Sequence, residues 1–275
     1  GLHESVGGDT NLASLAARHA VEVVNLRKVP SDGLRIGTGR ARESKAFRVL
    51  TVGTDANIGK TTTTLMMHVW HKKHGPGRSR FVATGPDGVL VKGRGVCIDR
   101  CITDFASGAM EDVILRESKG RDMLFIEGQD SLLSPCYAAV CVAVLHGSCP
   151  DAMVLCHIPS RRLHRHTNVP IPSLTQYIAA YEAMLSPMHP GRIVAISLNT
   201  MDLDADSAQR AIAQAAEETG LPTADPVRDG EAGVATLMGA VLKAATQAKH
   251  PMVKPATVRM TRSLSKKPAT SAIKR

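Results

Sequence analysis

Residues 51–64, TVGTDANIGKTTTT, combine glycine, lysine and hydroxyl side chains in the manner of a phosphate-binding loop. In such a loop, backbone N–H groups and the start of the following helix point at the anion. Lys60 would add a positive charge, and the Thr61 hydroxyl can hold Mg²⁺. The spacing departs from the standard GxxxxGK[ST] pattern, because Gly53 lies one residue early and Thr54 occupies the position of the first glycine. The predicted cofactor-binding residues are Gly53, Thr54, Asp55, Asn57, Gly59, Lys60, Thr61 and Thr62.

An acidic residue, Glu127, ends the apolar segment DMLFIEG at residues 122–128. The carboxyl ends of parallel strands meet at one edge of a sheet, so Glu127 should face the same edge as the phosphate loop. A carboxylate in that place can hold Mg²⁺ directly or through water. We therefore predict Thr61 and Glu127 as metal ligands if Mg²⁺ is used, with a capping carboxylate in a turn as the alternative. Asp130 puts a second carboxylate in the same turn.

Basic side chains follow another apolar segment, AMVLCH at residues 152–157. His157 can act as a general base near neutral pH, although a histidine at a strand end is as often structural. Arg161 and Arg162 can grip a carboxylate or a phosphate. His146 follows a further apolar run and is an additional candidate for substrate binding.

Other polar side chains have competing interpretations. The glycine-rich connection at 84–105 carries Asp87, Asp99 and Asp104, and either lies close to a ligand or is a plain connector. His68, His71 and His74 have no carboxylate partner at a suitable spacing, so we predict a solvated helix face rather than a metal site. The six cysteines form no CxxC pair and lie mostly in apolar stretches, which favours small buried side chains over zinc or disulfide sites.

Short apolar segments rich in β-branched residues must position these groups. The predicted strands lie at 48–53, 80–85, 122–128, 152–157 and 192–199, with a sixth at 21–26. The predicted helices lie at 10–19, 60–73, 103–116, 173–185, 204–219 and 231–248. Apolar strands that alternate with helices require a sheet covered on both faces. The predicted fold is α/β, with a mostly parallel, doubly wound sheet of the P-loop NTPase type.

The composition is that of a globular protein, with 43% hydrophobic and 21% charged residues among 275. The net charge of +9 comes mainly from residues 251–275, where seven lysines and arginines occur without an acid, leaving +2 for the rest. We interpret 249–275 as a mobile basic tail, and because no aromatic residue there could stack on a base, we predict no specific nucleic-acid partner. The longest apolar run, 138–145, is too short to span a membrane, and no signal peptide opens the chain. We therefore expect a cytoplasmic protein without a membrane span.

Several segments in order along the chain resemble the DgcN-like family, whose members pair a Rossmann-like N-terminal domain with a phosphate-loop domain. The resemblance runs from about residue 10 to 245 through VLTVGTD, GKTTT, FVATG, IEGQ, LHGS, PDAMVLCH, PIPSL, ISLN and ETGLP. It implies a remnant of the Rossmann-like domain at 1–47, a P-loop α/β domain at 48–248 and the basic tail at 249–275.

The characterised activity of that family is the N-acetylation of D-glutamate with acetyl-CoA. The resemblance therefore implies a small-molecule substrate, with the phosphates of acetyl-CoA held by the loop at 53–61. His157 or Glu127 would take a proton from the substrate ammonium, and Arg161 and His146 would bind the substrate.

Two other functions stay open. The phosphate loop also resembles that of dethiobiotin synthetase, which indicates an ATP- and Mg²⁺-dependent ligase as the alternative. Pro86, Asp87, Asp130 and Ser160 depart from the residues usual in the DgcN-like family, and the last two replace glycines, as in an inactive remnant that only binds a nucleotide or CoA. Related phosphate-loop enzymes often build sites between subunits, which leaves a homo-oligomer open.

Overall fold

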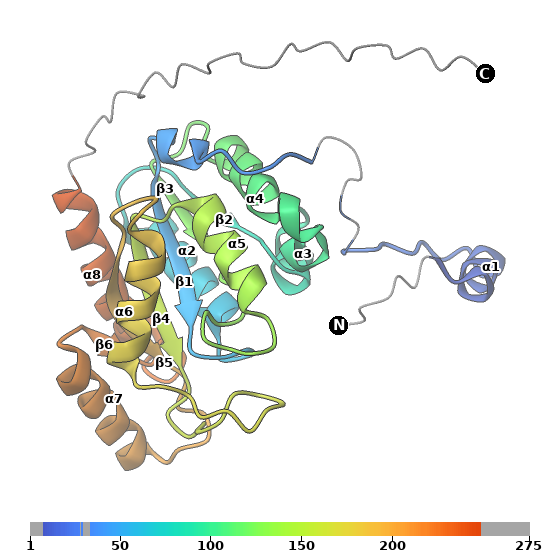
Figure 1. Ribbon diagram of the computed structural model, residues 1–275. Helices are drawn as coiled ribbons and strands as arrows, with labels where there is room; N and C mark the ends of the chain where they lie inside the picture. The colour runs from blue at the N-terminus through green and yellow to red at the C-terminus, as the bar shows by residue number, and fades with distance from the viewer. Residues whose placement is uncertain (1–7, 28, 30–33, 249–275) are drawn as a thin grey trace, which may run out of the picture.

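The computed structural model describes residues 8–27, 29 and 34–248, and the predicted basic tail lies outside these residues. Six strands form one sheet in the order β2-β3-β1-β4-β5-β6 (Figure 1). Every pair of neighbouring strands is parallel, which confirms the predicted α/β fold with a parallel sheet. The strands are β1 (Phe47–Gly53), β2 (Ser79–Val82), β3 (Met123–Ile126), β4 (Ala152–His157), β5 (Arg192–Leu198) and β6 (Thr223–Ala224).

Helices cover both faces of the sheet, as Figure 1 shows. The helices of the described residues are α1 (Thr10–Arg18), which does not contact the sheet, α2 (Lys60–His74), α3 (Pro86–Lys92), α4 (Thr103–Glu117), α5 (Ala138–Ser148), α6 (Leu174–Leu185), α7 (Ala205–Thr219) and α8 (Gly230–Gln247), with 3₁₀ turns η2 (Arg40–Glu43) and η3 (Ile98–Arg100). Alternate residues of a strand point to opposite faces, so β1 contributes side chains to two hydrophobic cores, one on each face of the sheet. Leu50 packs with α4, α5 and α6, whereas its neighbour Val49 packs with α2 and α8.

The sequence-based strands are confirmed except at 21–26. Val21, Val23 and Val24 are 48–66% exposed and form no strand, because no sheet edge lies beside them to pair with their backbone. The sixth strand is instead the two-residue β6, which pairs with β5. The apolar run at 138–145 forms most of the helix α5, and the connection at 84–105 contains α3 and η3.

The prediction of a solvated histidine face on α2 is wrong for His71. Its side chain is buried, and its ring lies 5.5 Å from the ring of Phe125 between centroids. Burial lowers the pKa of His71, so the ring stays neutral. The described residues contain no group of three His, Cys, Asp or Glu side chains that could hold a metal ion.

All six cysteines are free thiols. Four of them, Cys97, Cys141, Cys149 and Cys156, are buried as predicted, whereas Cys136 is exposed. Burial raises the pKa of Cys141, Cys149 and Cys156 to about 11.

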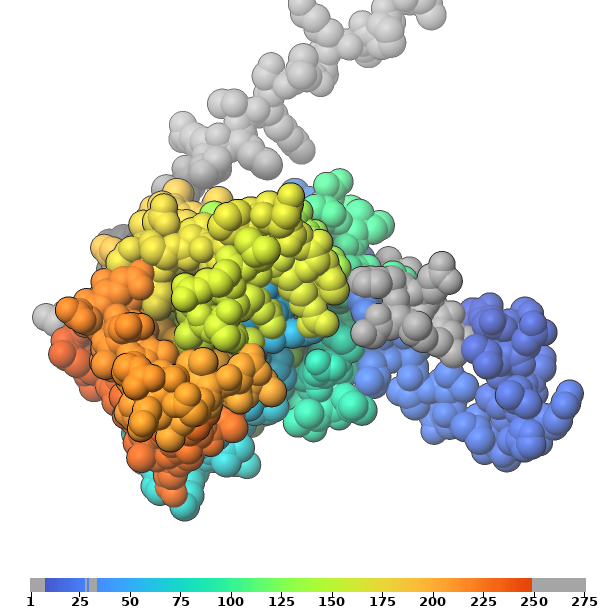
Figure 2. All heavy atoms as spheres, turned by 90° about the horizontal axis from the view of Figure 1, so that it is seen from below, coloured from blue at the N-terminus to red at the C-terminus, as the bar shows by residue number. Residues whose placement is uncertain are grey.

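Of the residues before β1, the helix α1 makes no buried contact with the sheet domain, whereas residues 34–46 pack against it. Helix α1 has no buried residue and stands apart from the body in Figure 2. Residues 34–46 run along α4, where the buried carboxylate of Glu111 accepts hydrogen bonds from the backbone of Thr38 and Arg40 at 3.1 and 2.7 Å. No helix among the described residues has the length and hydropathy to cross a bilayer.

Candidate functional site

Lys60 lies in a slot between two glycines at the carboxyl edge of the sheet. A Cβ on Gly53 would lie 3.0 Å from Lys60 Cδ, and one on Gly128 would overlap the Thr51 carbonyl oxygen and lie 3.3 Å from the same Cδ. The Lys60 ammonium is buried and donates to the Asp55 carbonyl at 2.7 Å. Burial lowers the pKa of Lys60. The early glycine at 53 therefore makes room for the lysine stem, which explains its place one residue before the usual position.

The backbone around this lysine has the form of an anion site. Helix α2 begins at Lys60, so the N–H groups of Lys60, Thr61 and Thr62 have no carbonyl in a preceding helical turn. Asn57 and Gly59 adopt positive φ values of 50° and 103°, which turn the chain sharply before the helix. All five residues line a cavity of about 530 Å³. Free N–H groups beside a lysine suit the phosphates of a nucleotide or of coenzyme A.

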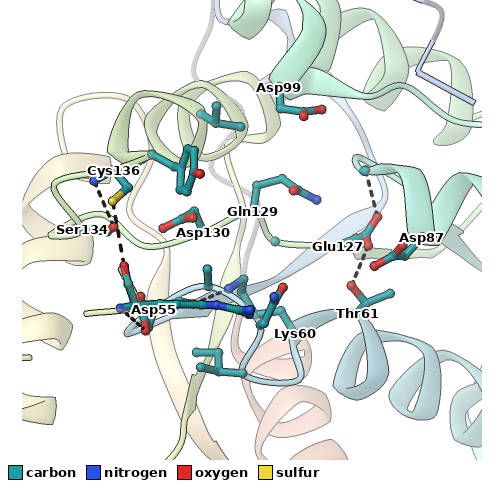
Figure 3. Close-up of a pocket in the computed structure, with 18 of the residues that line it drawn as sticks. Asp55, Lys60, Thr61, Asp87, Asp99, Glu127, Gln129, Asp130, Ser134 and Cys136 are labelled. Carbon is teal, nitrogen blue, oxygen red and sulfur yellow. Dashed lines mark hydrogen bonds between the residues drawn. The ribbon is translucent and has the colours of Figure 1, made fainter. Parts of the chain in front are cut away.

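Glu127 lines the same cavity next to Thr61, and its carboxylate accepts hydrogen bonds from three donors (Figure 3). The Thr61 hydroxyl donates to Oε1 at 2.7 Å, and the N–H groups of Thr84 and Gly85 donate to Oε2 at 2.9 and 3.1 Å. Burial raises the pKa of Glu127, and the nearby Asp87 adds to that rise. The structure thus brings together Thr61 and Glu127, the two residues predicted as ligands of Mg²⁺.

Gly88 in α3 is a part of the site that the sequence analysis did not identify. A Cβ at this position would overlap Glu127 Oε2. The glycine lies inside a short helix, where it costs backbone entropy, so its place is explained by the space that the carboxylate needs.

An ion pair between Asp55 and Arg161 stabilises the phosphate loop. Asp55 is buried and accepts from Arg161 Nη1 at 2.8 Å and from the Arg165 backbone N–H at 2.9 Å. Arg161 also donates to the Ala56 carbonyl at 2.6 Å. Arg161, the predicted substrate-binding residue, therefore braces the loop in this structure. Arg165, by contrast, is an exposed residue and is among those that line the cavity.

His157 lies on the far side of the same loop, where its Nδ1 is 2.8 Å from the Thr54 hydroxyl. Together with Arg161 and Arg162 it lines a second cavity of about 330 Å³. Burial, with smaller contributions from Arg162 and Arg161, lowers the pKa of His157 to about 4. The ring is therefore neutral at pH 7, and it lines the second cavity rather than the first.

His146 lies near the end of α5, with its Nε2 3.0 Å from the Met184 carbonyl oxygen, and lines neither of the two cavities. Its predicted role in substrate binding stays a prediction. The first cavity brings Glu127 together with the loop residues Asp55, Asn57, Gly59, Lys60, Thr61 and Thr62.

Two buried tyrosines of α6 support the loop and were missed by the sequence analysis. The Tyr181 hydroxyl donates to the Gly53 carbonyl at 2.8 Å and accepts from the Leu132 N–H at 3.0 Å. The Tyr177 hydroxyl donates to the Thr54 carbonyl at 2.9 Å. The available signal was their spacing of four residues on a helix, which puts two hydroxyls on one apolar face.

Asp130 adds an acid to the cavity wall between Gln129 and Ser134 (Figure 3). It follows β3 and has a positive φ of 39°, a backbone conformation that non-glycine residues seldom adopt. Burial raises the pKa of Asp130, while Lys60 and hydrogen bonds from Ser131 and Ser134 lower it.

Most of the chain is similar in sequence to known proteins. Residues 35–237 match the DUF1611_C P-loop domain, a domain of unknown function. A D-glutamate N-acetyltransferase from Pseudoalteromonas sp is 36% identical over 234 residues, which cover 84% of this chain and 68% of the relative. A protein of the same name from Tritonibacter scottomollicae is 34% identical over 243 residues, covering 88% and 72% of the two chains.

Solved structures agree with this similarity. A DUF1611 family protein from Anabaena variabilis is 38% identical, with a TM-score of 0.79 over 90% of this chain and 70% of the other. A cobyrinic acid a,c-diamide synthase from Mycobacterium smegmatis, with a bound ATP analog and magnesium, has a TM-score of 0.50 at 12% identity, over 72% and 95% of the two chains. The latter likeness is one of fold, and it agrees with the predicted P-loop NTPase type.

Proposed function

Because the chain belongs to the DUF1611 P-loop domain family, which is the DgcN-like family, we propose that it transfers an acetyl group from acetyl-CoA to the amino group of a D-amino acid similar to D-glutamate. The names of the two relatives support the reaction. The observation that carries the proposal on this chain is that a phosphate loop with its lysine, Lys60, and a buried carboxylate, Glu127, line one cavity.

The phosphates of acetyl-CoA would lie at the start of α2. The N–H groups of Lys60, Thr61 and Thr62 and the Lys60 ammonium are the donors available there. Bound acetyl-CoA would supply a thioester whose carbonyl carbon is open to attack by an amine. The chain must then bind the amine, align it and remove its proton.

Glu127 is better placed than His157 to take that proton, because it lines the cavity beside the phosphate loop. Burial raises its pKa towards the range in which a carboxylate accepts and releases protons, as a general base must. Arg165, also on the cavity wall, is free to hold a substrate carboxylate, a part that Arg161 is less suited to because it is engaged with Asp55.

The test is the release of free CoA thiol from acetyl-CoA by the purified chain, measured with paired D- and L-amino acids including glutamate. We expect release with D-glutamate and none with L-glutamate. Binding of CoA without release for any amino acid would contradict the proposal and favour the inactive binding remnant. The Glu127→Gln variant should lose release while still binding CoA.

One contact favours a second function, an ATP- and Mg²⁺-dependent ligase. The Thr61 hydroxyl and the Glu127 carboxylate are 2.7 Å apart at the phosphate loop, and both are oxygen ligands that suit Mg²⁺. The ligase would form ADP from ATP only in the presence of Mg²⁺ and an acid or amine substrate. The acetyltransferase would release thiol in the presence of a chelator, so the two assays separate the functions.

A further inference from the structure

The second cavity, which His157 lines, lies apart from the site at Lys60. Its walls are the segment that follows β4, the start of α6 and one face of the adjacent helix α7. Its volume of about 330 Å³ falls within the range of small-molecule sites. None of its lining residues also lines the first cavity, so it is a separate place for a ligand.

Two walls of the second cavity carry opposite charges. Arg162, in the segment after β4, is exposed, and its side chain forms no hydrogen bond or ion pair with a described residue. After burial, the charge of Arg162 is the largest cause of the lowered pKa of His157, so the guanidinium lies near that ring. Glu218, on α7, is also exposed; it accepts from the Thr175 N–H at 3.2 Å and forms no ion pair within residues 34–248. One unpaired cation and one unpaired carboxylate in a single cavity suit a zwitterion.

Most of the other lining residues of the second cavity are apolar. They include Ile171, Leu174, Leu198 and Ala211. An apolar group bound against them would be removed from water, which is favourable. A molecule that matches both the charges and this apolar lining is an α-amino acid with an apolar side chain.

Two residues of the second cavity also hold the phosphate loop. His157 Nδ1 lies 2.8 Å from the Thr54 hydroxyl, and Arg161 Nη1 donates to the Asp55 carboxylate at 2.8 Å and to the Ala56 carbonyl at 2.6 Å. Nε and Nη2 of Arg161 are not fully buried and donate to none of the described residues, so they are open to a carboxylate in the cavity. A ligand on these N–H groups would keep the guanidinium in its place against the loop.

We propose that the second cavity binds a free α-amino acid with an apolar side chain, and that the bound amino acid stabilises the phosphate loop. The carboxylate of the ligand contacts Arg162 and Arg161, and its ammonium contacts Glu218. This inference goes beyond the proposed acetyl transfer and does not depend on it, because no residue of the first cavity takes part in the binding.

Calorimetry with D- and L-leucine and two analogues tests the site. The analogue 4-methylpentanoate is leucine without the amino group, and 3-methylbutylamine is leucine without the carboxylate. The wild-type chain should bind one leucine enantiomer at least about tenfold more tightly than either analogue, because each analogue lacks one charged contact. In Arg162→Gln and in Glu218→Gln, leucine affinity should fall about 10- to 100-fold. Gln at position 218 still offers an oxygen to the Thr175 N–H, so the start of α6 is kept.

Glu217→Gln is the matched control, since Glu217 is the exposed neighbour of Glu218 on α7 and does not line the cavity. It should change leucine affinity less than about twofold, and so should Lys60→Ala, which alters only the first cavity. No leucine binding by the wild-type chain, equal affinity for 4-methylpentanoate, or an equal loss in Glu217→Gln would overturn the inference. A loss in Lys60→Ala without a loss in Arg162→Gln would place leucine in the first cavity and overturn it as well.

Hydrogen exchange followed by mass spectrometry tests the effect on the loop. Saturating leucine should slow amide exchange in peptides that cover residues 54–62 at least about threefold in the wild-type chain, and should leave it unchanged in Arg162→Gln. Leucine binding without slower exchange in the wild-type chain would overturn the coupling to the loop. Neither measurement uses acetyl-CoA, so a failure here leaves the acetyltransferase proposal standing, and a failure of thiol release leaves this inference standing.

Discussion

Removing the Tyr181 hydroxyl should destabilise the domain at the place where the phosphate loop begins. Tyr181 is fully buried, and its hydroxyl satisfies the Gly53 carbonyl at 2.8 Å and the Leu132 N–H at 3.0 Å. In Tyr181→Phe both backbone groups would be left buried without this partner. Each such loss costs about 1–3 kcal/mol, so we expect the free energy of unfolding to fall by about 2–4 kcal/mol after local relaxation.

Urea unfolding followed by far-ultraviolet circular dichroism measures this change. The midpoint should fall with an unchanged m-value, and the melting temperature should drop by roughly 5–15 °C for a domain of this size. Tyr137→Phe is the control, because Tyr137 is 43% exposed and its hydroxyl has no partner among the described residues. The control should stay within about 0.5 kcal/mol of the wild-type chain. A loss below about 0.5 kcal/mol in Tyr181→Phe as well would refute the argument that this hydroxyl holds the loop.

Three further changes test other parts of the site. Lys60→Ala should weaken CoA binding by about 10- to 100-fold in calorimetry while the melting temperature is kept, and equal affinity would rule out the phosphate loop. Gly88→Ala should displace Glu127 and lower thiol release at least about tenfold, whereas Gly239→Ala, which meets nothing within 4 Å, should leave release intact; equal rates would show that the carboxylate tolerates the methyl group. The pKa of His157 is about 4 in the folded chain and about 6.5 when unfolded, so stability present above pH 6.5 is lost as the pH falls towards 4. His157→Gln should remove about 2–3 kcal/mol of the loss between pH 7 and pH 4.5 in urea unfolding, and an unchanged pH dependence would count against a neutral buried ring.

The fold was predictable where local pattern and burial agree. Segments such as RVLTVG and AMVLCH are continuous apolar runs, as strands of a sheet covered on both faces must be, and they form β1 and β4. The segment at 21–26 has the same β-branched composition but no neighbour to pair with. Conversely, β6 is two residues long and exists because β5 offers its backbone, which no local pattern records.

Some residues of the candidate site were predictable from the sequence and others were not. The GKT motif and Glu127 sit next to strand ends, so their meeting follows from the parallel order of the sheet. Tyr181 and Arg165 reach the loop across separations of 128 and 110 residues, and a single sequence does not reveal such contacts. The burial of His71 was likewise out of reach, because helix α2 is amphipathic only weakly and the packing of Phe125 decides which face is covered.

The exposure of the cysteines decides how thiol release can be measured on this protein. Thiols with a pKa raised to about 11, such as those of Cys141, Cys149 and Cys156, react slowly with disulfide reagents because little thiolate is present. Cys136 is exposed, so it should give a fast initial signal that does not grow with turnover. The same thiol lines the first cavity, where a bulky adduct would obstruct the acceptor. A colour reagent added from the start would therefore inhibit the reaction it reports, and samples should be quenched before the reagent is added.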